Sequence, residues 1–318
     1  MPRILILGAT GYIGSALASS LLRSNHTVYG LARTPSKANQ LARQEIIPVL
    51  GSVQDSAAYI ALIHTAHIDI VIDCAGANQE SATVLSDVRT AGEERLKQKG
   101  PKLGFVYTSG TFVHGSSQRR VSDLDPVGTA EANAQPPRLV AWRPQMERDV
   151  LSAGDVLHTV VVRPSLVYGR EHGVWSSFFG PVLDAAERGE EGVVKVPLRL
   201  GSRPALVHVD DVAEGMRCVV EKLPLLAGTG VYPVFDLVTS QESMEDIFRA
   251  FAREVGLKGR VELVGAGEDD IFALAMQSDG NLDASRAEQL LGWRPGRRGF
   301  VERMAVFAKA FVAAQEKV

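Results

Sequence analysis

Three glycines near the amino terminus stand at a spacing that suits phosphate binding. Gly8, Gly11 and Gly14 directly follow the apolar run 4–7, and an amphipathic helical pattern follows over 15–24. A buried strand, a glycine turn and a helix in this order bring free backbone N–H groups and the positive end of a helix dipole to one point. The pattern predicts binding of a dinucleotide pyrophosphate; the alternative is a turn without a ligand. The residues expected around the pyrophosphate are Gly8, Thr10, Gly11, Tyr12, Ile13 and Gly14.

Two cations follow the next apolar run. The stretch 28–33 is predicted to be the second strand; it ends in Arg33, and Lys37 follows four residues later. In dinucleotide-binding folds this point faces the adenosine ribose, where a carboxylate favours NAD. Two cations without a nearby carboxylate suit a 2′-phosphate instead. The sequence therefore predicts NADP (NADPH) over NAD(H), the alternative being two ordinary solvated charges.

Composition narrows the class of protein. The chain has 318 residues, enough for about two domains, and 45% of them are hydrophobic. A formal net charge of −3 argues against a nucleic-acid partner, and no apolar run reaches the length of about 18 residues that a membrane span needs. Cys74 and Cys218 are the two cysteines, which form no disulfide framework. We expect a cytoplasmic protein, and we predict no metal site.

Apolar runs alternate with helical patterns through the first half of the chain. This alternation predicts a parallel sheet with helices on both faces, that is, an α/β fold with a Rossmann-type doubly wound parallel sheet. The segment 116–136 is rich in small and polar residues and is expected to be a loop. Pro144 is expected inside a helix and predicts a kink there. The expected strands are 4–7, 28–33, 46–50, 69–73, 103–107 and 159–163, and the longer expected helices are 82–99 and 138–153.

The texture of the sequence changes after Gly169, where aromatic, glycine and charged residues mix. We expect the later segments to form a smaller C-terminal α/β substrate domain over the carboxyl edge of the sheet. The expected division is an NADP-binding Rossmann domain from 1–168 and 205–238, and a substrate-binding domain from 169–204 and 239–318.

Four stretches, taken in order, resemble the extended branch of the short-chain dehydrogenase/reductase superfamily, which includes NAD(P)-dependent epimerases and dehydratases. These stretches are 8–14, 163–169, 207–213 and 282–295. The resemblance covers nearly the whole chain. It implies a Rossmann domain with NAD(P) at the glycine turn and with Pro164 passing the nicotinamide.

Further residues are expected along the cofactor. Ser52 and Val53 follow the third strand and are expected near the adenine. Small residues follow the fourth strand, where the backbone would pass close to a cofactor. Among them Cys74 is a candidate nucleophile, although we expect a small buried residue. With those that the resemblance adds, the set is Cys74, Ala75, Gly76, Ser109, Gly110, Pro164 and Leu166.

The resemblance also implies a proton relay made of a Ser or Thr and a Tyr-x-x-x-Lys pair. Here the position of the serine is Gly110, and the best match to the pair is Trp142 with Met146, neither of which moves a proton near neutral pH. None of the six tyrosines precedes a lysine by four residues. The sequence predicts the scaffold without this relay.

Three side chains are candidates for the missing catalytic chemistry. Thr111 places a hydroxyl beside Gly110, His114 carries an imidazole that could serve as acid or base, and Tyr168 carries a phenol after the sixth strand. The alternatives are a hydrogen-bonded structural histidine and a structural tyrosine. Arg143 either binds an acidic substrate or faces solvent. The residues expected near the substrate cavity are Glu131, His172 and Trp175.

Three functions stay open. The first is an NADP(H)-dependent oxidoreductase, such as a carbonyl reductase, acting on a small molecule with a proton from His114, substrate or water. The second is a non-redox isomerase, cyclase or lyase on the same scaffold, and the third is an NADP-sensing regulator without catalysis. The resemblance also implies a homodimer through the helices at 82–99 and 138–153.

Overall fold

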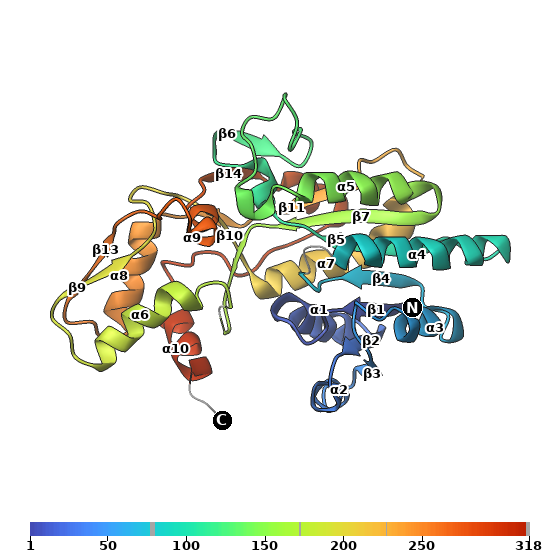
Figure 1. The fold of residues 1–318 in the computed structure, drawn as a ribbon, viewed down its shortest axis with the longest axis horizontal. Helices are drawn as coiled ribbons and strands as arrows, with labels where there is room; N and C mark the ends of the chain where they lie inside the picture. The colour runs from blue at the N-terminus through green and yellow to red at the C-terminus, as the bar shows by residue number, and fades with distance from the viewer. Residues whose placement is uncertain (77–79, 172, 227, 316–318) are drawn as a thin grey trace.

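A central sheet of parallel strands carries helices on both faces, and a smaller group of helices and strands packs beside it (Figure 1). The computed structural model describes residues 1–76, 80–171, 173–226 and 228–315. The predicted α/β class with a doubly wound, Rossmann-like sheet is confirmed. In spatial order the seven strands are β11 (Val234–Leu237), β7 (Leu157–Pro164), β5 (Leu103–Thr108), β4 (Ile70–Asp73), β1 (Arg3–Leu7), β2 (Thr27–Ala32) and β3 (Ile47–Leu50).

The order of the strands reverses at the middle of the sheet, at β1; the region above the carboxyl end of β1 is called the crevice. The chain starts in β1, moves outward to β3, and returns to the other side of β1 with β4. Ile6 of β1 pairs with Gly30 of β2 on one side and with Ile72 of β4 on the other. Connections on the two sides of β1 therefore diverge above its carboxyl end, which is where ligands bind in open parallel sheets.

Alternate residues of β1 face different helices. Ile4 and Ile6 belong to a core with α1 (Tyr12–Arg23) and α7 (Val209–Leu226). Leu5 and Leu7 belong to a second core on the other face of the sheet. All four side chains are fully buried, as expected for a strand that is covered on both faces. The helices of the second face are α3 (Ala57–Thr65), α4 (Glu80–Lys97) and α5 (Arg143–Ser152).

A third apolar core holds the smaller group together, which lies at the left of Figure 1, away from α3 and α4. Aromatic rings dominate it: the rings of Phe179 and Phe251 stack with centroids 3.9 Å apart. Leu166 and Leu206 join this core, whereas Trp293 packs into the core of α1 and α7. The elements around it are α6 (Ser176–Glu187), α8 (Met244–Glu254), α10 (Met304–Gln315), β9 (Val193–Val196) and β13 (Arg260–Leu263).

The short elements complete the chain. A second sheet of three strands has the order β12, β10, β8, and β9 pairs in parallel with β13. The expected domain boundaries stay a prediction. The remaining elements are α2 (Pro35–Ala42), α9 (Ile271–Met276), β8 (Leu166–Tyr168), β10 (Ala205–His208), β12 (Ser240–Gln241) and β14 (Gly280–Asp283).

Two stretches differ from the expectation. The segment 116–136 contains a strand, β6 (Ser117–Ser122), which pairs in parallel with β14. The middle of β6 is exposed and carries two arginines, so no apolar alternation marks it in the sequence. The helix expected over 138–153 begins at Arg143. Pro144 consequently lies in its first turn, where proline is tolerated, and produces no kink.

Replacing Gly14 by alanine is expected to lower the free energy of unfolding by about 2 kcal/mol, because the new Cβ would lie within 2.1 Å of the Gly8 carbonyl oxygen. Gly180→Ala in α6 is the control: its Cβ would meet nothing within 4 Å, so helix propensity should leave the chain equally or more stable. Urea unfolding followed by circular dichroism measures both. A Gly14→Ala chain of wild-type stability would contradict the close approach.

Candidate cofactor and active site

The glycine turn packs directly on the end of the neighbouring strand. Gly8 has a φ of +89°, and a Cβ there would lie 2.6 Å from the carbonyl oxygen of Cys74. Gly11 is exposed and precedes the first residue of α1, whose first turn contains no acidic side chain. An uncovered helix N-terminus without a competing carboxylate fits a pyrophosphate. Thr10 and Ile13 lie in the same turn, half-buried.

Tyr12 connects the glycine turn to the beginning of the smaller group. Its hydroxyl donates a hydrogen bond to the carbonyl oxygen of Gly169 at 2.6 Å. Burial raises the pKa of Tyr12 well above its ordinary value, and the nearby Glu171 raises it further. The phenol is therefore a structural link between two segments and not an acid near neutral pH.

The side of the crevice predicted to hold the adenosine is cationic. Arg33 directly follows β2 and is exposed, and Lys37 is exposed in the first turn of α2, where its Nζ lies 3.2 Å from Gln40 Oε1. Within the described ranges, neither cation forms an ion pair with a carboxylate. Ser52 and Val53 are half-buried after β3, and Ser52 forms an isolated bridge with Asp55.

The end of β4 is lined by a buried carboxylate and a thiol. Asp73 accepts hydrogen bonds from the Ala75 backbone N–H at 3.0 Å and from Ser81 Oγ at 2.8 Å. The Sγ of Cys74 lies 3.4 Å from Thr108 Oγ1. Burial raises the pKa of the Cys74 thiol to about 12, which disfavours the thiolate that a nucleophile needs. Gly76 follows, exposed, with a φ of +62°.

A buried network of charged side chains lies under the turn that follows β5. The guanidinium of Arg163, on β7, donates to both carboxylate oxygens of Glu147 on α5, at 3.0 and 2.6 Å. Ser109 Oγ donates to the same carboxylate at 2.5 Å. On its other side Arg163 faces Asp236 of β11 at 3.6 Å, and Asp236 lies 2.8 Å from the Nε2 of His114.

Sequence reasoning included Ser109 and His114 but missed Glu147 and Asp236. The available signal was Arg163 itself, a charge in the middle of an apolar strand, because a charge there requires buried partners. The two carboxylates that pair with Arg163 lie far from it in the sequence: Glu147 is 16 positions away and Asp236 more than 70. A local sequence pattern does not reveal contacts over such separations.

The predicted catalytic residues lie in different surroundings. Thr111 and His114 are buried in a 3₁₀ turn (Thr111–His114), and the ring of His114 is engaged by Asp236, which matches the structural alternative. Tyr168 lies in the third core, stacks on Phe300 with centroids 4.3 Å apart, and donates to the Arg297 carbonyl oxygen at 2.6 Å. Burial raises the pKa of the Tyr168 phenol.

The turn after β5 and the end of β7 do meet. A Cβ on Gly110 would lie 3.6 Å from the carbonyl oxygen of Pro164, and the Ser109 N–H donates to the Val162 carbonyl oxygen at 2.8 Å. Leu166 follows in β8 and is buried. The structure thus brings together the strand ends that were predicted to flank the nicotinamide.

The start of α5 presents a cation to the same edge of the sheet. Met146 is buried in the core and Trp142 is half-buried. Arg143 is also half-buried; its Nη1 donates to the Thr108 carbonyl oxygen at 3.2 Å, and its Cζ lies 5.0 Å from the centre of the Trp142 ring. Of the residues expected near the substrate cavity, Trp175 is buried, Glu131 is exposed, and His172 lies outside the described residues.

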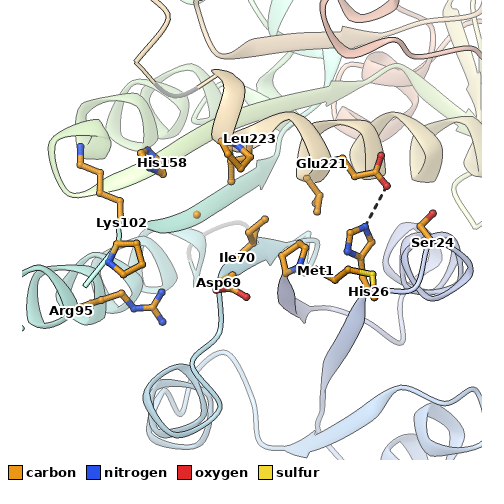
Figure 2. A pocket seen from close by; sticks show the side chains of 15 residues that line it. Met1, Ser24, His26, Asp69, Ile70, Arg95, Lys102, His158, Glu221 and Leu223 are labelled. Carbon is orange, nitrogen blue, oxygen red and sulfur yellow. Dashed lines mark hydrogen bonds and ion pairs between the residues drawn. The ribbon is translucent and has the colours of Figure 1, made fainter. Parts of the chain in front are cut away.

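A cavity of about 710 Å³ lies at the opposite, amino edge of the sheet (Figure 2). Ile70 and Leu223 contribute apolar surface, and Arg95, Lys102 and His158 contribute polar groups. Ligands of open parallel sheets bind at the carboxyl ends of the strands. This cavity is therefore separate from the crevice above the glycine turn.

In the described part of the chain, no group of three or more His, Cys, Asp or Glu side chains is arranged to hold a metal ion. In the same residues no helix has the length and apolar character needed to cross a membrane.

The strand order and the glycine turn after β1 define a Rossmann-type fold with the geometry of a dinucleotide site. The chain belongs to the NAD dependent epimerase/dehydratase family, whose model matches residues 4–232. The resemblance stated from the sequence is thereby confirmed at the level of the superfamily.

Relatives with known sequences match most of the chain. An uncharacterized protein of Saccharomyces cerevisiae is 26% identical, with 94% of this chain and 97% of the relative covered. A 4-hydroxy-2-methyl-3-oxo-4-farnesyl-3,4-dihydroquinoline-1-oxide ketoreductase of Stigmatella aurantiaca is 25% identical, with 70% of this chain and 65% of the relative covered.

Solved structures share the fold over nearly the whole chain. A dTDP-glucose 4,6-dehydratase of Bacillus anthracis in complex with NAD superposes with a TM-score of 0.74 at 15% identity, covering 99% of this chain and 98% of the other. A UDP-glucose 4-epimerase of Bifidobacterium longum with NAD+ and UDP superposes with a TM-score of 0.69 at 18% identity, covering 98% of each chain.

Glu147→Gln is expected to lower the free energy of unfolding by about 3 kcal/mol, because it leaves the buried Arg163 short of a counter-charge. Asp155→Asn is the control, since the pair of Asp155 with Arg89 is exposed to solvent and should contribute much less to stability. Urea titrations at pH 7 measure both. Equal, small losses in the two variants would show that the network is not a stabilising unit.

His208 predicts a pH dependence of stability. Burial lowers the pKa of His208 from 6.5 to about 4. Asp210 raises this pKa, whereas the nearby arginines at positions 170, 297 and 303 lower it further. The unfolded state therefore binds the proton first, so stability is lost as pH falls from about 6.5 towards 4. His208→Asn should reduce this loss by about 2 kcal/mol in unfolding titrations at pH 7 and pH 4.5. An unchanged difference between the two pH values would refute it.

Proposed function

We propose that this chain is an NADP(H)-binding enzyme of the extended short-chain dehydrogenase/reductase type that transfers a hydride to or from a small molecule, as a carbonyl reductase does. The observation that carries the proposal is that Arg33 and Lys37, at the proposed adenosine side of the crevice, form no ion pair with any carboxylate of the described residues. A 2′-phosphate would supply the negative charge that this point lacks.

The residues of the crevice fit a nicotinamide dinucleotide along its whole length. Gly8, Gly11 and the start of α1 would hold the pyrophosphate, and Ser52 and Val53 would lie at the adenine. The strand ends at β4, β5 and β7 would face the nicotinamide, which supplies or accepts the hydride when it is bound. Solved relatives in complex with NAD support the class of cofactor.

The reaction would proceed without a Tyr-x-x-x-Lys pair. Trp142 and Met146 offer no titrating group, and the phenol of Tyr168 donates to a backbone carbonyl. His114 remains a candidate through its contact with Asp236, but its burial favours water or the substrate as the source of the proton. A correctly placed hydride donor contributes more to such a reduction than any one acid.

A second candidate is a non-redox conversion by an isomerase, cyclase or lyase that keeps a bound cofactor. Two observations favour this function: the sequence has no Tyr-x-x-x-Lys pair, and UDP-glucose 4-epimerases are among the relatives in sequence and in structure. The ketoreductase relative favours the redox function. An NADP-sensing regulator, which binds the cofactor without turnover, is the third outcome.

Assays separate these functions. NADPH oxidation with a panel of ketones and aldehydes is expected; turnover without net oxidation would indicate the non-redox class, and binding without turnover a regulator. Mass spectrometry of ligand released from denatured protein would identify a co-purified substrate or cofactor. The homodimer, the cytoplasmic compartment and the division into two domains stay predictions, for sedimentation, localisation and limited proteolysis to test.

Arg33→Ala is expected to weaken NADPH binding by about tenfold or more while changing NADH binding by less than about threefold, because only NADPH carries the 2′-phosphate. Fluorescence titration of the reduced cofactors measures both affinities. Arg249→Ala on α8, an exposed arginine paired with Glu245, is the control and should change neither. Equal losses for NADPH and NADH would remove the assignment of Arg33 to the phosphate.

A further inference from the structure

Arg143 lies at the carboxyl edge of the sheet. Within the described residues it forms no ion pair, whereas Arg163 contacts two carboxylates. The nearest carboxylate along β4, Asp73, is buried and already bonded to Ala75 and Ser81. Burial raises the pKa of Asp73, and the charge of Arg143 acts in the opposite direction.

The guanidinium is held in place by its own surroundings. Arg143 is the first residue of α5, one N–H donates to the Thr108 carbonyl oxygen at 3.2 Å, and the Trp142 ring lies beside it. A guanidinium has five N–H donors in a rigid fork, so it can donate to further acceptors besides Thr108. This geometry suits binding of a second planar group with two oxygens, such as a carboxylate.

The topology places Arg143 on the substrate side. The pyrophosphate position is at β1, and Arg33 marks the adenosine half over β2. Thr108 ends β5, two strands from β1 in the opposite direction. The nicotinamide half of the dinucleotide would therefore lie at the end of β5, next to Arg143. Because nicotinamide and its ribose carry no anion beyond the pyrophosphate, the anion that would meet Arg143 belongs to the substrate.

We propose that Arg143 binds a carboxylate of the substrate beside the nicotinamide, so that the substrate class is a small oxo acid or the corresponding hydroxy acid. This inference rests on the proposed function. It assigns to Arg143 a binding and orienting role and no proton transfer, since a guanidinium offers hydrogen-bond donors and no acceptor.

The test compares acids with their esters in binding experiments that need no turnover. Pyruvate, 2-oxoglutarate and phenylglyoxylate, each with its methyl ester, are titrated calorimetrically into the wild-type chain with and without NADP+. At least one acid is expected to bind about tenfold more tightly than its ester. Arg143→Gln should abolish this preference, and Arg143→Lys should restore part of it, because lysine keeps the charge without the fork.

The matched control is Arg148→Gln, an exposed arginine on the same helix that bonds to Gln145. It should leave every affinity unchanged. NADPH affinity, measured separately by fluorescence, should stay within about twofold in Arg143→Gln.

Three results would overturn the assignment: no acid binds more tightly than its ester, Arg143→Gln weakens acid and ester alike, or Arg143→Gln chiefly weakens NADPH binding. The last result would make Arg143 a cofactor ligand. The failure of the proposed function has a different signature, because the wild-type chain itself would then bind neither NADPH nor NADH.

Discussion

One buried cation, Arg163, joins four elements that approach the active edge of the sheet. Its guanidinium connects β7 to α5 through Glu147 and to β11 through Asp236, and Asp236 in turn engages His114 of the 3₁₀ turn. A charge without water around it requires partners in good geometry, so the positions of these elements are coupled. Ser109, bonded to the same carboxylate, extends the coupling to the turn after β5.

This coupling has a consequence for the site. The carboxylate of Glu147 lies one helical turn beyond Arg143, so the partner that holds α5 in place also sets where Arg143 stands. The arginines near this edge of the sheet differ in their partners. Arg163 is paired with buried carboxylates, whereas in the described part of the chain Arg143 and Arg33 form no ion pair. We propose that these two cations bind ligand anions on either side of the glycine turn, whose backbone N–H groups suit a pyrophosphate.

Much of the first half of the chain follows from local pattern. The glycine turn, the strands at 4–7 and 103–107 and the long helix after β4 carry strong signals, since strands buried on both faces must be apolar throughout. The predictions were wrong where the local signal is weak. The strand β6 was predicted to be a loop because its middle is polar and exposed. Pro144 was predicted inside a helix but lies in the first turn of α5. Helices α2 and α3 were not predicted, because both are short and because α3 is apolar on most of its surface and therefore shows no clear helical pattern.

The sequence by itself determined the class of fold, the place of the glycine turn and the cationic end of β2, because each depends on residues within about ten positions of one another. Only the tertiary structure decided that Arg163 is held by Glu147 and Asp236, that Asp236 engages the ring of His114, and that Arg143 bonds to the end of β5 without an ion pair to any of the described residues. Those facts depend on contacts between distant segments, and a side chain's charge becomes structural or functional according to which partners the fold brings within a few ångströms.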